Sequence, residues 1–247
     1  MKRSTAARPL EGNAGLAFAG ARVPKGLIVG GENARRMRAA RNRHGKPNSD
    51  VLRRYFDASD TRRVASDRWV VDFPADTTPE EASLYERPWR LFERAGGVLH
   101  ARADPMRIAI ARLDSFLVAP LGRAPRGFVR MDSATLPGAG LCVVATDDDF
   151  LAAALKSGVF ETWVAAHGGR LRVRHVTSFP FPWPPRTGRS ELTRAQFELR
   201  DAAVRASTED LDAAVAAAYG WRDIADEDDL AERLRALNSA RHSPARK

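Results

Sequence analysis

Four prolines and three aromatic residues occupy the eight positions of Ser178–Pro185, which read SFPFPWPP. Each proline fixes its backbone φ angle and lacks the amide hydrogen that a helix or a central strand needs. The segment can therefore be neither, and it divides the chain into two parts. We expect it to follow an extended path, with Phe179, Phe181 and Trp183 packed onto both parts.

The part of the chain before these prolines mixes two kinds of pattern. Short apolar runs, several of them rich in β-branched and aromatic residues, predict strands, at residues 68–73, 108–110, 115–119, 127–131, 141–145 and 170–175. In residues 10–29 short apolar pieces alternate with glycines, which indicates short strands and tight turns. Ser49 or Asp50 is a candidate cap for a turn that starts at Val51.

Helices are predicted at three places in the same part. Residues 32–43 are basic and helix-prone. Thr78 before Pro79 is typical of a helix start, here of a helix that runs toward Glu93. The acids Asp147–Asp149 precede a run whose apolar residues recur at helical spacing, at Leu151, Leu155, Val159 and Trp163. A Gly-Gly pair at positions 168 and 169 ends this third helix.

After the prolines the pattern becomes helical throughout. Residues 191–237 have helical spacing, interrupted at Tyr219–Trp221, and Ser207 or Thr208 is the expected cap of the helix before that interruption. The sequence therefore predicts an α+β fold, with a mixed-sheet module over residues 10–185 and a small helical module over residues 186–240. Residues 1–9 and 241–247 are expected to be disordered.

Composition narrows the class of protein. The longest apolar runs, such as residues 140–145, are far too short to span a bilayer, and no apolar signal core follows the basic start Met1–Ser4. The single cysteine, Cys142, excludes an internal disulfide framework and fits a reducing cytoplasm. Because it lies in an apolar run, we interpret it as a core residue.

The net charge of +9 is concentrated near the start of the chain. Residues 1–46 hold 11 Lys/Arg and 2 Asp/Glu, which accounts for the whole excess. A basic face suits a polyanion such as DNA, since binding releases condensed counterions. The alternative is that arginine is abundant because the genome is rich in G and C, in which case the charge carries no functional meaning.

Sites for metals, phosphates and nucleophilic catalysis are not recognisable. The five histidines are scattered, no GxGxxG or GxxxxGK[ST] loop occurs, and no serine lies in a GxSxG elbow. Asp147–Asp149 lacks the alternating ligands of a calcium loop, so we interpret it as a helix cap rather than a cation site. No metal or cofactor is therefore expected in this chain.

Arginines cluster in two places before the prolines, at Arg123, Arg126 and Arg130 and again at Arg170, Arg172 and Arg174, the last followed by His175. In the second cluster the arginines alternate with Leu171 and Val173. On a strand this alternation places all three guanidinium groups on one face. Such a face can reach phosphates or the acceptors of guanine in a major groove. The alternative is an ordinary solvated strand face.

The order of short motifs resembles the specificity half of MmeI-like, type IIG restriction–modification enzymes. These are single chains that join an endonuclease, an adenine DNA methyltransferase and a target recognition domain. The resemblance spans roughly residues 10–240 and rests on the order of its pieces, which are residues 15–20, 26–29, 47–52, 68–73, 80–85, 147–150, 160–163, 177–182, 211–221 and 232–238.

The resemblance implies a DNA target recognition domain with its helical C-terminal part. The family's S-adenosylmethionine loop and its Asn/Asp-Pro-Pro-Tyr/Phe motif are missing, because Pro184-Pro185 lies between Trp183 and Arg186. We therefore expect a specificity module without catalysis of its own. Its partners would be double-stranded DNA and a separately encoded methyltransferase or restriction subunit. Adenine-N6 methylation, with S-adenosylmethionine, would belong to that partner.

Two alternatives remain open at this point, a diverged DNA methyltransferase and a protein-interaction module that does not bind DNA. On the first hypothesis the expected contacts are polar or basic side chains that touch phosphates or base edges. The first choices are Arg170, Arg172, Arg174 and His175, and the second choices are Arg123, Arg126 and Arg130. The DNA backbone would be held by Lys46, Asn48, Arg62 and Arg63.

Overall fold

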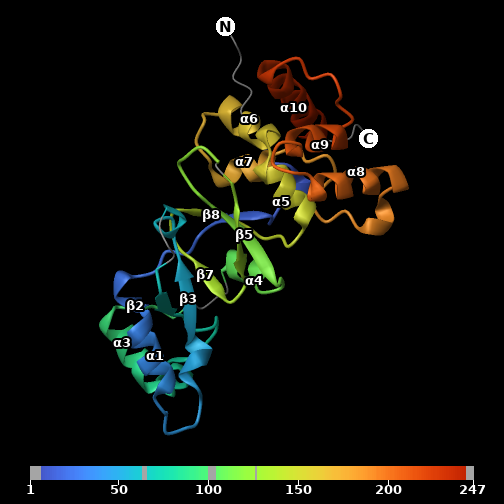
Figure 1. Cartoon of the computed structure of the whole chain (residues 1–247). Coiled ribbons are helices and arrows are strands. Elements are labelled where there is room, and N and C mark those ends of the chain that lie inside the picture. The colour runs from blue at the N-terminus through green and yellow to red at the C-terminus, as the bar shows by residue number, and fades with distance from the viewer. Residues whose placement is uncertain (1–6, 63–65, 100–103, 126, 243–247) are drawn as a thin grey trace.

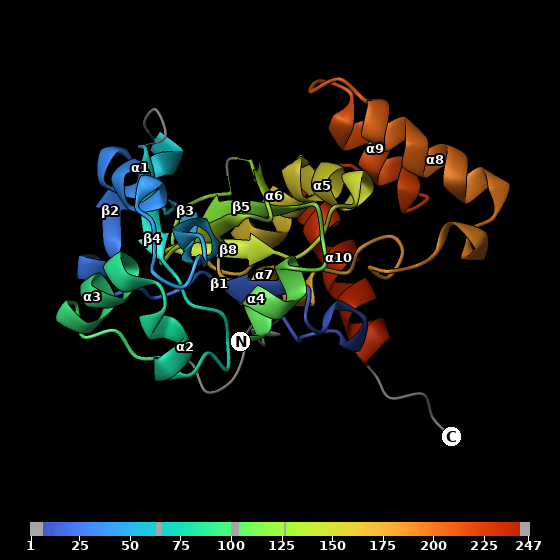
Figure 2. The same ribbon diagram turned by 90° about the horizontal axis from the view of Figure 1, so that it is seen from below.

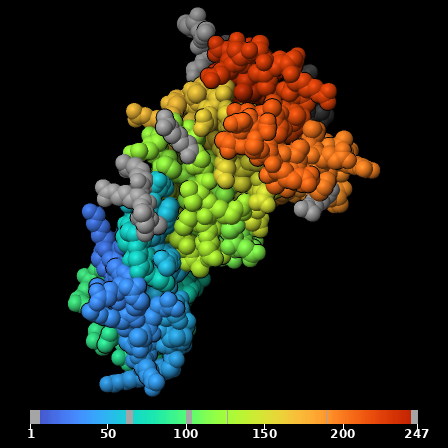
Figure 3. All heavy atoms as spheres, viewed as in Figure 1, coloured from blue at the N-terminus to red at the C-terminus, as the bar shows by residue number. Residues whose placement is uncertain are grey.

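The structure, a computed structural model, describes residues 7–62, 66–99, 104–125 and 127–242, without the side chains of Arg62 and Arg189. The molecule is elongated (Figures 1 and 3), with α1 (Gly31–Ala39) near one end and α10 (Glu227–His242) near the other. In the described ranges, no helix combines the length and apolar character needed to cross a membrane.

An antiparallel sheet lies in the middle of the molecule. Its strands follow the order β1 (Ala17–Ala19), β8 (Leu141–Val144), β5 (Ser115–Pro120) and β6 (Val129–Asp132). Both faces are covered, since Phe116 and Val118 pack into one hydrophobic core while Leu117 and Ala119 pack into another. This explains why β5 and β8 have continuous apolar runs rather than an alternating pattern.

Cys142 lies in the core on one side of this sheet. Its side chain is fully buried, and burial raises the pKa of the thiol to about 12. A thiol that stays protonated is a poor nucleophile and a poor metal ligand. The interpretation of Cys142 as a core residue is confirmed.

A second sheet forms the N-terminal end, in the order β2 (Ile28–Gly30), β4 (Arg68–Val71), β3 (Leu52–Phe56) and β7 (Thr135–Pro137). Its first three strands are antiparallel and β7 runs parallel to β3. The helices α1, α2 (Pro79–Ser83) and α3 (Glu86–Arg94) lie beside this sheet, whereas α4 (Pro105–Ile110) lies next to β1 of the central sheet (Figure 2). The 3-10 turns of this region are η2 (Lys25–Leu27), η3 (Asn48–Val51) and η4 (Asp60–Arg62).

Two glycines allow the two sheets to meet. The amide of Gly20 donates to the carbonyl of Leu141, and a Cβ atom at Gly20 would lie 2.0 Å from the carbonyl oxygen of Gly138. A Cβ atom at Gly138 would lie 2.2 Å from the hydroxyl of Tyr55. A side chain at position 20 would therefore collide with the backbone at Gly138, and one at position 138 would collide with the Tyr55 ring.

Helices cover the other face of the central sheet. These are α5 (Asp149–Lys156), α6 (Gly158–Ala166) and α7 (Val173–Ser178), with the 3-10 turn η1 (Glu11–Asn13) beside them. The C-terminal helices follow, α8 (Arg194–Arg205), α9 (Leu211–Ala218) and α10, after the turn η5 (Arg189–Glu191). Val215 and Leu234 from these helices enter the same core as Leu155 and Trp163, so one core joins the central sheet to the C-terminal helices.

The proline segment lies between these two layers and contacts both. Phe179 packs edge-on against Phe160, with ring centroids 5.1 Å apart, and Trp183 packs against Phe150 at 5.1 Å. From α10, Asn238 donates to the carbonyl of Ser178 at 2.7 Å. Arg241, also on α10, donates to the carbonyls of Phe181 and Pro182. The predicted packing onto both flanking parts is confirmed.

The mixed α+β fold and its helical C-terminal part are confirmed, and so are several strands, including β4, β5, β6 and β8. The expected helix starts also hold. Thr78 forms a capping box with Glu81, and Asp148 accepts from the amides of Phe150 and Leu151. Two long helices are each broken in two, α2 from α3 and α5 from α6.

Four predictions of local structure are wrong. Residues 108–110 belong to the helix α4, which Asp104 caps in front of Pro105. Residues 170–175 end in the helix α7 rather than forming a strand. Neither Ser207 nor Thr208 is the N-cap of α9, since that position is Asp210, and no side chain caps η3.

Residues at both ends of the described chain make hydrogen bonds, although the sequence predicts disorder over residues 1–9 and 241–247. Residues 1–6 and 243–247 lie outside the described residues. Arg8, however, exchanges hydrogen bonds with the side chain of Asn238, and the Nδ1 atom of His242 lies 3.2 Å from the carbonyl of Pro9. The two ends of the described chain are therefore held together on α10.

Candidate nucleic-acid interface

Two loops from distant parts of the chain meet at Leu171. Gly122, just after β5, donates its amide to the carbonyl of Leu171 at 2.9 Å, and Leu171 donates to the carbonyl of Arg123 at 2.7 Å. The Leu171 side chain is fully buried. Arg123, Arg170 and Arg172 are exposed beside this anchored residue. We call these three, with exposed Arg174 on α7, the arginine corner.

Within the part of the chain that the structure describes, no acceptor pairs with the guanidinium groups of the arginine corner. Among the described residues none of the four side chains makes a hydrogen bond or an ion pair, although 14 ion pairs occur elsewhere. Four cations without carboxylates nearby leave a local positive charge that is free to meet phosphate oxygens. The sequence placed Arg170, Arg172 and Arg174 together, and the structure adds Arg123 to them.

The arginines come together by a route that differs from the predicted strand. Arg172 is extended and occupies the N-cap position of α7, so only Arg170 and Arg172 flank the inward side chain of Leu171. Arg174 lies on the first turn of α7. The helix starts here because the Nδ1 atom of His175 accepts a hydrogen bond from the Arg172 amide at 3.2 Å.

His175 is not exposed, which corrects its expected role in DNA contact. Its side chain is fully buried, and burial together with the charges of Arg174 and His167 lowers the pKa of His175 to about 4. Because Nδ1 accepts, the neutral ring carries its hydrogen on Nε2. His175 therefore supports the loop that carries the arginines, and its buried side chain is not accessible to DNA.

Arg130, a second-choice contact, is occupied by acceptors of the protein. Its guanidinium donates to Asp149 at 2.6 Å, to Ser115 Oγ at 3.0 Å and to the carbonyl of Asp147 at 3.1 Å. These contacts lie at the start of β5, whereas Arg123 follows the end of that strand. Arg130 therefore ties β6 to the start of α5 and is not part of the arginine corner.

The remaining predicted contacts divide into three kinds. Asn48 is fully buried, donates to the carbonyls of Met37 and Ala40, and accepts from Asn42, so it ends α1 rather than facing DNA. Lys46 is exposed, with its ammonium 5.7 Å from the centre of the Tyr85 ring. Arg126, Arg63 and the side chain of Arg62 lie outside the described residues.

A basic and aromatic surface on α1, β3 and β4 was missed from the sequence. The guanidinium carbons of Arg38 and Arg54 lie 5.4 Å and 5.1 Å from the centroid of the half-buried Trp69 ring, and Arg54 also pairs with Asp67. Trp69 also donates to Asp67 at 2.8 Å. The basic helix and the strand were each predicted, yet nothing local in the sequence shows that they pack together. In Figure 1, α1 lies toward one end of the molecule and β5 lies in its middle.

The acids Asp147–Asp149 have structural partners. Asp148 caps α5 and pairs with Arg200 at 2.6 Å, while Asp149 pairs with Arg130. Across the described ranges, no three or more His, Cys, Asp and Glu side chains are grouped so as to hold a metal ion. The acids therefore act in helix capping and ion pairing.

In comparisons with known proteins, no protein-family model and no curated protein matches the sequence. A solved structure matches in fold, that of the type IIL restriction–modification enzyme MmeI in complex with DNA. The TM-score is 0.58 and the identity 15%, over 93% of this chain and 36% of that chain. The chain thus shares its fold with a portion of that enzyme and spans little more than a third of its length.

Proposed function

We propose that the chain is a DNA-binding specificity module, a target recognition domain that works with a restriction–modification or adenine-methylating partner. The arginine corner carries this proposal, because it gathers four unpaired guanidinium groups around one anchored residue. The likeness in fold to part of an enzyme solved in complex with DNA supports it.

The proposed mode of action is non-covalent. Arg123, Arg170, Arg172 and Arg174 would contact phosphates or base edges, while the surface around Trp69 would contact the DNA backbone farther along the molecule. Methyl transfer, with S-adenosylmethionine, would reside in a methyltransferase on another polypeptide, since the motifs for that chemistry are missing from these residues.

A salt series of binding measurements tests the proposal. Fluorescence anisotropy with a labelled random duplex should detect binding at about 50 mM salt, and the affinity should fall steeply toward about 200 mM. A second series adds a methyltransferase with the matching fold. We expect this addition to increase the preference of the chain for one DNA sequence over random duplexes. Lack of binding at the lowest salt, with and without that methyltransferase, would refute the proposal.

A methyl-transfer assay separates this proposal from the diverged-enzyme alternative. The lone chain is incubated with duplex DNA and labelled S-adenosylmethionine, and we expect no label in the DNA. Label transferred by the lone chain above the level of a heat-inactivated sample would overturn the assignment as a specificity module.

A further inference from the structure

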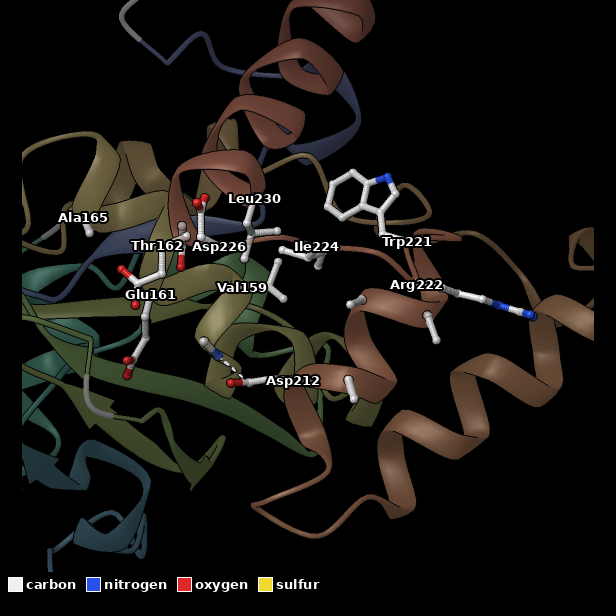
Figure 4. Close-up of a pocket in the computed structure, with 15 residues that line it drawn as sticks. Val159, Glu161, Thr162, Ala165, Asp212, Trp221, Arg222, Ile224, Asp226 and Leu230 are labelled. Carbon is white, nitrogen blue, oxygen red and sulfur yellow. Dashed lines mark hydrogen bonds between the residues drawn. The ribbon is translucent and has the colours of Figure 1, made fainter.

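A cavity in the C-terminal part of the molecule differs in chemistry from the arginine corner. It has a volume of 790 Å³ and opens between α6, α9 and the start of α10. Its size falls in the range of known binding pockets. Figure 4 shows Val159, Ile224 and Leu230 converging at its centre, with Trp221 at one end.

The walls of this cavity are helices with small residues at regular spacing. Gly158, Thr162 and Ala165 line it from α6, while Ala213 and Ala217 line it from α9. Spacings of three and four residues place each set along one face of its helix. Two helix faces without bulky side chains leave a groove into which the side chains of a third helix can insert.

The floor of the groove is apolar and fixed in place. Val159, Ala216 and Leu230 are buried. The Trp221 ring stacks on Tyr219, with centroids 4.3 Å apart and an interplanar angle of 10°. Trp221 and Ile224 remain partly exposed at the edge of this floor, and apolar anchor residues of a partner would gain free energy by covering them.

The charge around the groove is negative. Among the described residues that line it are four carboxylates, Glu161, Asp212, Asp226 and Glu227, against a single guanidinium, Arg222. Figure 4 shows Arg222 pointing away from the centre. Asp212 accepts from the Gly158 amide and Asp226 from the Asp229 amide. Glu161 and Glu227 are exposed, and no described residue pairs with them.

We propose that this groove binds a cationic amphipathic helix of a partner polypeptide. The apolar face of that helix would cover Trp221 and Ile224, and its Lys or Arg residues would meet Glu161 and Glu227. Charge complementarity selects this occupant, because the same carboxylates repel DNA and acidic peptides. The inference does not depend on DNA binding, since it uses a separate surface of opposite charge.

The test uses the full chain and three synthetic peptides. The first is a helix with leucines at i, i+3, i+4 and i+7 and lysines elsewhere. The second has the same composition in scrambled order, and the third has glutamates in place of the lysines. We expect saturable binding of the first peptide below about 100 μM, with the other two binding at least tenfold more weakly, a difference of about 1.4 kcal/mol.

Two variants locate the binding site. Ala213→Trp fills the groove from the exposed side of α9 and should abolish binding of the lysine peptide. Glu161→Lys reverses one unpaired charge and should weaken binding about tenfold. Glu232→Lys is the matched control, because Glu232 is exposed on α10 but does not line the groove. Thermal unfolding checks that each variant folds.

The outcomes are distinct. The proposal is supported if the lysine peptide binds the unaltered chain and Ala213→Trp abolishes this binding. Glu161→Lys should weaken it, while Glu232→Lys should leave it unchanged. Equal binding of all three peptides, no saturable binding of any of them, or unchanged binding in both folded groove variants would overturn it. These results leave the DNA proposal untouched, because none of the measurements contains DNA.

Discussion

Arginines serve opposite purposes at the N-terminal sheet and at the arginine corner. At the N-terminal sheet, Arg53 and Arg107 share the buried carboxylate of Asp72, and Arg68 bridges Asp57 and Asp60. At the arginine corner, none of the four guanidinium groups has such a partner among the described residues. Because an arginine paired inside the protein has its charge neutralised, only the second set keeps charge for an external polyanion.

The titration behaviour of the N-terminal set fits a structural role. Burial alone would raise the pKa of Asp57, yet hydrogen bonds from Arg68 and Ser59 hold it below its ordinary value. Burial also lowers the pKa of Arg53, against the opposing attraction of Asp72. These groups stabilise one another, so changes here should alter stability, whereas changes at the arginine corner should alter binding.

Asp72→Ala should have the largest effect on stability among the variants that test this difference between the two sets of arginines. It leaves two partly buried guanidinium groups without their shared carboxylate, and we expect the free energy of unfolding to fall by about 3 kcal/mol. Urea denaturation measures it. Asp67→Ala is the control, since its partners Arg35 and Arg54 are exposed and the loss of stability should be much smaller. Equal losses in the two variants would contradict the assignment.

The buried His175 predicts an acid-sensitive support beneath the arginine corner. Its folded pKa is about 4, below its ordinary 6.5, so the unfolded chain takes up the proton first as the pH falls. The contribution of the neutral His175 to the free energy of unfolding is therefore fully present above about pH 6.5, and it declines by about 3 kcal/mol toward pH 4. Denaturation at several pH values should show the decline, and His175→Asn should reduce it. An unchanged decline in that variant would exclude His175 as its source.

Asn48→Ala tests whether a residue expected to contact DNA is structural instead. The change removes donors to the Met37 and Ala40 carbonyls and the acceptor of Asn42, all at the end of α1. We expect a loss of about 2 kcal/mol in unfolding free energy. Affinity for DNA at a temperature where the variant is folded should stay within about twofold. A large loss of affinity in a stably folded variant would restore Asn48 as a contact.

Arg130→Ala should have the smallest effect. Because Arg130 already pairs with Asp149 at the surface, its removal should cost less than about 1 kcal/mol and change DNA affinity less than about twofold. Anisotropy and urea denaturation on the same preparation measure both. A loss of affinity equal to that of Arg170→Ala would show that an ion pair does not remove an arginine from binding.

The sequence predicted elements that local chemistry determines. The capping box at Thr78, the cap at Asp148 and the strand Arg68–Val71 depend on neighbouring residues, and all three occur. The same pattern at Asp104-Pro105 indicated a helix, but the apolar run at Ile108 was interpreted as a strand. A three-residue apolar run cannot by itself distinguish a buried helix face from a strand.

The candidate site was predictable only in part. The alternation from Arg170 to Arg174 suggested one strand face, and nothing local shows that His175 turns inward and starts a helix. The pairing of Leu171 with Gly122 and Arg123 joins segments about 50 residues apart. Contacts of this kind depend on how the whole chain folds, so the sequence named most of the arginines without their arrangement.

The slope of DNA affinity against salt tests the central claim most directly. One variant replaces Arg123, Arg170, Arg172 and Arg174 with alanine. The control replaces four ion-paired arginines, Arg90, Arg194, Arg205 and Arg233, so that the net charge is the same. The slope of log affinity against log salt is negative. We predict that it becomes shallower by about 3 in the first variant and by less than about 1 in the control. Equal slopes in the two variants would contradict the account.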